Sequence, residues 1–195
     1  MLYETQRFIM MPFTRGLVKG NYAAWWIDPD VTRHNSHGLF PQTSQGLEEW
    51  LNSIGPNNIV WAIMAKVDTL GSEIDHLNHI GNVSLQSLSW INRSAEFAII
   101  LGEKDYWGKG YGEEALRLVL EHGFKKLGLN RIWTGTGSSN VGMQKLAERV
   151  GMILEGRSRQ GKFNDGKFLD IYHYGILQHE YLKEEPIKEV LGHLL

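Results

Sequence analysis

The sequence contains no cysteine among its 195 residues. This absence excludes disulfides, cysteine-ligated zinc, iron–sulfur clusters and a thiol nucleophile, and because it fits a reducing compartment we expect a cytoplasmic protein. No stretch approaches the roughly 18 consecutive apolar residues of a transmembrane helix. The first residues, 1–5, lack the basic start and apolar core of a signal peptide. We therefore expect no membrane partner.

An excess of charge of one sign is also missing, because 20 basic residues face 22 acidic ones. Nucleic-acid binding usually requires a basic surplus, so we expect no nucleic-acid partner. The 5 prolines form no proline-rich linker, and no internal repeat divides the chain. With 42% apolar and 22% charged residues, the composition is typical of a folded protein. We expect a single domain over residues 1–195.

What the sequence does contain is an alternation of helix and strand patterns. Apolar residues at helical spacing predict helices over residues 17–27, 47–54, 113–127 and 140–150. Short apolar runs predict strands over residues 59–66, 80–88, 95–101, 131–136, 153–159 and 169–177. The segments 31–43 and 164–166 are predicted as a polar loop and a hairpin turn, and 178–195 as a charged helical tail. This order predicts an α/β fold with a mixed sheet.

A glycine-rich segment separates the strand 95–101 from the helix 113–127. Alternating glycines allow a sharp turn and a close approach of the main chain to a ligand. A helix N-terminus behind such a turn offers free N–H groups and a partial positive charge. We therefore predict a cradle for phosphate or pyrophosphate, with a tight turn that binds nothing as the alternative. The segment consists of Trp107, Gly108, Lys109, Gly110, Tyr111 and Gly112.

Two common nucleotide-binding motifs do not fit this segment. A P-loop follows its Gly-Lys with Ser or Thr, whereas Gly110 follows Lys109 here. A Rossmann fingerprint would place its third glycine at position 113, which is Glu113, and an acidic residue near 134–136, where Thr-Gly-Thr stands. The phosphate ligand predicted here therefore belongs to another class.

The order of the motifs resembles the GNAT superfamily of acetyl-CoA-dependent N-acyltransferases. Strand 95–101 with Glu96, the glycine turn and its helix are similar to the acetyl-CoA motif of that family. Asn140, which the residues alone predict as a helix N-cap, stands in the motif that follows. The N-terminal half, with Arg7 and Trp50, is similar to the subgroup of ribosomal-protein N-terminal acetyltransferases, the RimJ/RimL type. The resemblance covers roughly residues 5–178.

The resemblance implies a mostly antiparallel central sheet that splays apart at the cofactor site and is flanked by helices. The pantetheine arm of acetyl-CoA would add to the exposed strand edge at Ile99, Ile100 and Leu101. The pyrophosphate would take N–H groups from residues 108–112, and Trp107 stands where the family usually has Gln or Arg. Asn140 would bind the cofactor arm or orient the amine. The resemblance implies no metal.

The chemistry of acyl transfer requires a base, because the amine must lose a proton before it attacks the thioester. Glu96 is the candidate base, acting through water, and a purely structural strand carboxylate is the alternative. The usual tyrosine acid of the family is replaced by Ala147, and a serine of the subgroup by Met143. We therefore expect catalysis by positioning more than by acid catalysis. Proton donors that remain open are Ser84, Tyr172 and Tyr174.

The loop over residues 28–41 would line the acceptor pocket. Asp28 or Asp30 would bind a cationic amine, while Trp25 and Trp26 would pack on its carbon skeleton or belong to the core. His34 and His37 have no third ligand at a convincing spacing, so we predict no metal site. Lys162, beside the hairpin turn, is expected to be solvated. The predicted substrate residues are Trp26, Asp28, Arg33, His34, Asn35 and Ser84.

The predicted function is transfer of an acetyl group from acetyl-CoA to a primary amine. The acceptor is a protein N-terminus, a polyamine, an aminoglycoside or an amino sugar. One alternative is transfer of another acyl group, such as succinyl. The other is a non-catalytic CoA-binding or sensor protein, because Ala147 and Met143 replace polar residues. A homodimer is expected from the family.

Overall fold

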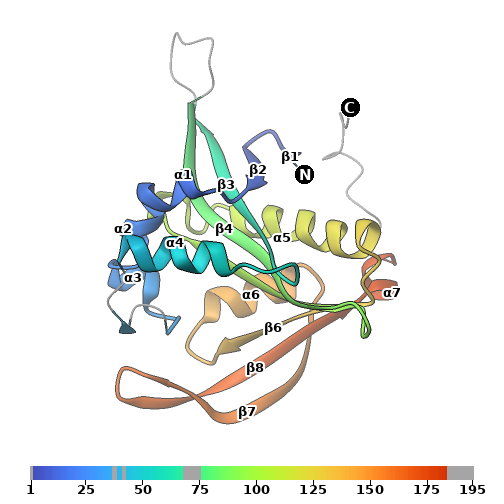
Figure 1. The fold of residues 1–195 in the computed structure, drawn as a ribbon. Coiled ribbons are helices and arrows are strands. Elements are labelled where there is room, and N and C mark those ends of the chain that lie inside the picture. Colours follow the sequence, from blue (N-terminus) through green and yellow to red (C-terminus); the bar gives the residue numbers. More distant parts are fainter. Residues whose placement is uncertain (1, 37–38, 41–42, 68–75, 184–195) are drawn as a thin grey trace.

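A single eight-stranded sheet organises the chain (Figure 1). The computed structural model describes residues 2–36, 39–40, 43–67 and 76–183. The strand order is β1-β2-β3-β4-β5-β6-β8-β7, and every neighbouring pair is antiparallel except β5 and β6. The strands are β1 (Tyr3–Glu4), β2 (Phe8–Pro12), β3 (Ile59–Val67), β4 (His76–Ser89), β5 (Ser94–Leu101), β6 (Arg131–Gly137), β7 (Ile153–Asn164) and β8 (Lys167–Leu177).

Helices cover both faces of the sheet and enclose two hydrophobic cores. On one face, Val18, Tyr22 and Trp25 pack with Leu47 against β3. On the other face, Leu116 and its neighbours of α5 pack on β4 and β5. The first group comprises α1 (Arg15–Leu17), η1 (Val18–Tyr22), α2 (Ala23–Trp25), α3 (Pro29–Thr32) and α4 (Ser44–Ser53). The second group comprises α5 (Tyr111–Glu121), η4 (His122–Lys126) and α6 (Val141–Arg149).

The predicted α/β fold, with a mixed and mostly antiparallel sheet flanked by helices, is confirmed. Two strands were missed, β1 and β2. Their apolar runs are short and β2 ends at Pro12, so neither shows the periodicity of a strand. Phe8 and Met10 of β2 are nevertheless fully buried, because they belong to the core beneath α5, and β2 pairs with β3 along its whole length.

The sheet splays apart between β5 and β6. These strands pair only from Ser94 with Arg131 to Glu96 with Trp133, although β5 continues to Leu101 and β6 to Gly137. Beyond Glu96, β5 keeps its register with β4 alone. The two halves of the sheet therefore diverge from this point.

The C-terminal segment begins with the short helix α7 (Gln178–Tyr181). The rest of the predicted helical tail, residues 184–195, lies outside the described residues. Among the residues that the structure describes, no helix combines the length and the apolar character needed to cross a bilayer.

Candidate active site

The open edge of β5 presents main-chain groups to the cleft between the two halves of the sheet. Arg131 N–H donates to Arg93 C=O on the β6 side, whereas Gly102 N–H donates to Ile80 C=O on the β4 side. Main-chain groups alternate sides along a strand, so odd-numbered residues of β5 face the cleft and even-numbered residues face β4. Ile99 therefore turns its N–H and C=O into the cleft, and Ile100 turns its own toward β4.

The glycine turn leads from β5 into α5 through left-handed backbone. Gly108 has φ of 71° and Gly110, which caps α5, has φ of 84°, and other residues adopt such angles only with strain. A Cβ at Gly108 would meet no heavy atom within 4 Å, so the turn borders open space there. The first N–H groups of α5 have no partner within the helix. Glycine-lined space beside these N–H groups fits a pyrophosphate.

Arg7 binds the glycine turn and the first turn of α5 by hydrogen bonds. Its Nη1 donates to Lys109 C=O at 2.8 Å and its Nε to Glu114 Oε2 at 2.7 Å. Its guanidinium also lies 4.4 Å from the centre of the Tyr111 ring. Arg7 therefore fixes the turn and neutralises a carboxylate that would otherwise repel an anion at this helix N-terminus. The sequence showed Arg7 as part of the family pattern but gave no sign of this contact.

Trp107 ties the glycine turn to the end of β5. Its Nε1 donates to Leu101 C=O at 2.8 Å, so this carbonyl is occupied while Ile99 stays open. The Arg33 guanidinium lies over the Trp107 ring, 5.7 Å from its centre. Arg33 was predicted on the substrate side, but the structure places it beside the glycine turn.

Two cavities meet at β5. The cleft cavity, of about 660 Å³, lies between β5 and β6, and Glu96, Thr136 and Asn140 are among the residues that line it. The second cavity, of about 580 Å³, lies under α4 and beside β4 and β5, and we name it the acceptor cavity because Trp26 and Ser84, two of the predicted substrate residues, are in its lining. Ala98 and Ile99 line both cavities. The two cavities therefore border the same segment of β5.

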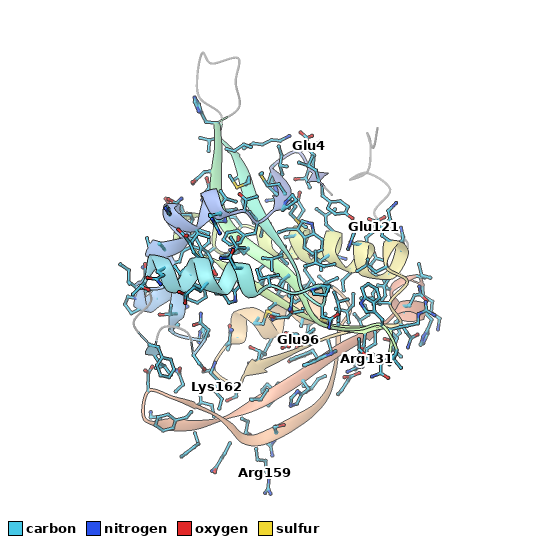
Figure 2. The ribbon with its side chains drawn as sticks, viewed as in Figure 1. Glu4, Glu96, Glu121, Arg131, Arg159 and Lys162 are labelled. Carbon is cyan, nitrogen blue, oxygen red and sulfur yellow. The ribbon has the colours of Figure 1, made fainter. Side chains whose placement is uncertain are left out.

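Glu96 is half-buried in the cleft cavity, two residues before Ala98 (Figure 2). Burial raises the pKa of its carboxyl above the usual value, because the charged form loses water. A carboxylate of raised pKa takes up a proton more readily than an exposed one. The cleft position and the raised pKa of Glu96 agree with its predicted role as general base, which stays a prediction.

Asn140 caps α6 as predicted, since its Oδ1 accepts from Met143 N–H at 3.2 Å. The capping bond engages the oxygen and turns the amide so that its NH₂ group remains to donate. Asn140 and Met143 both line the cleft cavity. The capping bond therefore fixes the Asn140 amide at the lining of the cleft cavity.

The loop after α3 separates the two cavities. Asn35 lines the acceptor cavity, whereas His34 and Ser36 line the cleft cavity. Burial lowers the pKa of His34, assisted by the charges of Arg33 and Lys162. His37 lies outside the described residues.

The hairpin of β7 and β8 holds this loop in place. Lys162 Nζ donates to His34 C=O, and Asn164 Nδ2 donates to Arg33 C=O at 3.1 Å. Figure 2 shows Lys162 on the side of the hairpin that faces the loop and Arg159 on the opposite side. The prediction that Lys162 is solvated is wrong, because it is half-buried and burial lowers its pKa.

Asp28 and Asp30 are engaged elsewhere. Asp28 Oδ1 caps α3 by accepting from Asp30 N–H at 2.9 Å, and its Oδ2 lies 2.9 Å from Lys104 Nζ. Lys104 also pairs with Asp30, and its hydrogen bond to Asp28 holds the pKa of the Asp28 carboxyl below its usual value. Neither carboxylate is among the described residues that line the two cavities. The structure thus gives Asp28 a structural role as a cap and ion-pair partner.

Of the three candidate proton donors, one lines one of these two cavities and two do not. Ser84 lines the acceptor cavity opposite Ala98, its partner in the β4–β5 register. Tyr174 is buried, donates to Glu148 at 3.3 Å, and has a pKa raised by burial. Neither Tyr172 nor Tyr174 is among the described lining residues. Within the described part of the chain, no three His, Asp or Glu side chains gather as a metal site requires.

Comparisons with known proteins agree with this geometry. A family model described as the acetyltransferase (GNAT) domain matches residues 7–153. Protein p20 of Bacillus licheniformis, an uncharacterized N-acetyltransferase, is 28% identical over 140 residues, 69% of this chain and 73% of its own. A spermidine N(1)-acetyltransferase of Vibrio cholerae is 34% identical over 79 residues, 40% of this chain and 45% of its own.

A solved structure shows the same fold. The spermidine N-acetyltransferase of Vibrio cholerae, crystallised with CoA and spermine, superposes with a TM-score of 0.77 at 23% identity and covers 90% of this chain and 98% of its own. The family model covers most of the sequence, including the glycine turn and Asn140. The chain therefore belongs to the GNAT family of acetyltransferases, as an acyl-CoA N-acetyltransferase that takes its acetyl group from acetyl-CoA.

Proposed function

We propose that acetyl-CoA lies in the cleft between β5 and β6 and that the amine enters through the acceptor cavity. The observation that carries this proposal is the meeting of the two cavities at Ala98 and Ile99. The N–H groups of residues 108–112 would hold the pyrophosphate. The open main chain of Ile99 would pair with the amide groups of the pantetheine arm, as a further strand does at a sheet edge.

The chain's own residues would then prepare the amine for attack. Acetyl-CoA supplies an activated acetyl thioester. Glu96 would accept a proton from the amine, directly or through water, and thereby free its nitrogen lone pair. The C–N bond forms as the C–S bond breaks, and the departing CoA thiolate takes up, directly or through water, the proton that the new amide nitrogen loses. The Asn140 amide, in the cleft cavity, and Ser84, in the acceptor cavity, would orient the reactants on either side of the junction, by which we mean the shared residues Ala98 and Ile99.

The finer assignment, to the RimJ/RimL type, rests on the N-terminal half. Arg7 belongs to the pattern of that type, and its contact with the glycine turn gives the pattern a physical reason. A homodimer is part of the same proposal. Strand β7 is an edge strand whose Ile153 and Leu154 are more than half exposed, and such an edge favours pairing with a second copy. Light scattering of the purified protein tests the dimer.

The activity is tested with acetyl-CoA and a panel of primary amines, by following the release of free CoA and the mass of the product. We expect turnover with at least one amine and a product heavier by one acetyl group. Succinyl-CoA in place of acetyl-CoA tests the alternative acyl group. Calorimetry with CoA runs in parallel, because tight binding without turnover of any amine would contradict catalysis and favour the sensor.

A further inference from the structure

The acceptor cavity has an uncharged lining. None of the described residues that line it is acidic or basic. One wall is aromatic: the Tyr22 and Trp50 rings stack with centres 5.9 Å apart, and the Trp26 ring meets Tyr22 edge-on at 5.4 Å. Glu96, in the cleft cavity, is the one carboxylate among the described lining residues of both cavities.

One buried donor in this cavity has no partner. Asn82 lines the cavity from β4 and is only 5% exposed. Its Oδ1 accepts from His79 Nε2 at 2.8 Å, which fixes the orientation of the amide. Its Nδ2 is buried and makes no hydrogen bond with any described residue. Buried N–H groups are almost always paired in folded proteins, so an unpaired one beside a cavity points to a ligand.

Asn82 lies close to the junction of the cavities. It pairs in register with Ile100, and Ser84 pairs with Ala98. Two residues along a strand span about 7 Å. An oxygen bound by Asn82 would thus lie a few bonds from a nitrogen placed at Ala98.

We propose that this cavity selects a primary monoamine with an aromatic or apolar body, and that Asn82 Nδ2 donates to an uncharged carbonyl oxygen of that body. The inference rests on the proposed function and names its acceptor class. An amide of an aromatic amino acid has the required parts: an amine, a ring for the aromatic wall and a carbonyl oxygen on the carbon next to the one that carries the amine. A polyamine does not, because its further ammonium groups would enter a lining without a carboxylate.

The first test compares acceptors on the wild-type enzyme. We expect kcat/KM for phenylalaninamide to exceed that for spermidine by tenfold or more. A preference for spermidine would overturn the inference while leaving the acetyltransferase activity intact. Absence of turnover with every amine, despite binding of CoA, would contradict the proposed function itself.

The second test removes the donor. In Asn82→Leu we expect kcat/KM to fall about tenfold or more for phenylalaninamide and to change less than about threefold for phenethylamine, which lacks the oxygen. Each amine is compared only with itself in wild type and variant, so differences in amine basicity cancel. Equal losses for both amines would show that Asn82 acts on the structure alone and would overturn the inference.

Two further variants keep the test decisive. Asn82→Asp keeps an acceptor for His79, loses the donor and adds a carboxylate, so activity should shift from phenylalaninamide toward spermidine. This variant decides the question if Asn82→Leu does not fold. Asn92→Ala, in the exposed turn between β4 and β5, should leave both amines and the CoA affinity unchanged.

Discussion

Glu96 lies at the last position where β5 pairs with β6. Its neighbours in the register, Gln86 and Trp133, pair with it on both sides, so its main chain is fixed. Its side chain nevertheless reaches the cleft cavity, where burial raises its pKa. The sequence could name Glu96 from its strand position, but the burial that separates a base from an ordinary surface carboxylate needed the structure.

Replacement of this carboxylate should slow the reaction and remove its pH dependence. In Glu96→Gln we expect kcat to fall by a factor of about 10²–10⁴, which is the usual contribution of a general base. The acid limb of the pH–rate profile, which reflects deprotonation of Glu96, should disappear. CoA affinity in calorimetry should stay constant. An unchanged profile would mean that another group accepts the proton.

The same substitution, Glu96→Gln, should lower activity but raise the stability of the fold at neutral pH. Because the folded-state pKa of Glu96 is raised above the usual 4.5, the folded state holds the proton more tightly than the unfolded state. The stability from this group is therefore full below the unfolded pKa and is lost as pH rises through the folded pKa. Glu96→Gln should be more stable than wild type at neutral pH and not at low pH. Urea unfolding across this range measures the difference.

Gly110 carries a prediction with a matched control. An aspartate there would add strain at a φ of 84° and a negative charge beside the phosphate site, so CoA affinity should fall at least about tenfold. Gly166, in the β7–β8 turn, has a similar φ of 75° and open space around its Cα. Gly166→Asp should cost similar stability and leave CoA affinity intact. Equal affinities of the two variants in calorimetry would remove the cradle.

At the scale of elements, the sequence predicted the middle of the chain better than its ends. Long periodic segments such as 113–127 and 140–150 matched α5 with η4 and α6, because one apolar face decides them. Strand β2 was missed, because it is short and its partner strand β3 lies more than 40 residues away in the sequence. The splay between β5 and β6 was expected from family resemblance alone, since no local pattern encodes where two strands part.

The residue just before the missed strand β2, Arg7, contacts the glycine turn. Arg7 stands just before β2 and donates to Lys109 C=O and Glu114. In Arg7→Met, Glu114 would lose its partner at the N-terminus of α5, and CoA affinity should fall about five- to tenfold. Arg15→Met, which removes an exposed arginine bonded to Asn52, is the control and should bind CoA as wild type does. Calorimetry at two salt concentrations tests the electrostatic part, which should weaken in high salt.

At the scale of the whole molecule, the splayed sheet predicts that a bound cofactor stabilises the fold. The halves β1–β5 and β6–β8 pair with each other only through Ser94–Glu96 and Arg131–Trp133, so a ligand in the cleft adds contacts that the sheet lacks. Ligand that binds only the folded state at 100 times its Kd contributes about 2.7 kcal/mol. We therefore expect CoA to raise the melting temperature and to slow exchange of amides at the cleft.

Hydrogen exchange resolved to single residues can locate this effect. The N–H of Ile99 faces the cleft, whereas the N–H of Ile100 faces β4 and is already paired. CoA should therefore slow exchange at Ile99 by more than tenfold, because this N–H gains a partner. Exchange at Ile100 should slow only as far as CoA stabilises the whole fold. Gly110→Asp serves as the control at the same CoA concentration, because it should bind too weakly to protect either amide. An exchange rate at Ile99 that CoA leaves unchanged would mean that CoA stabilises the fold without pairing with β5, and the cofactor would then have to be held from the glycine turn alone.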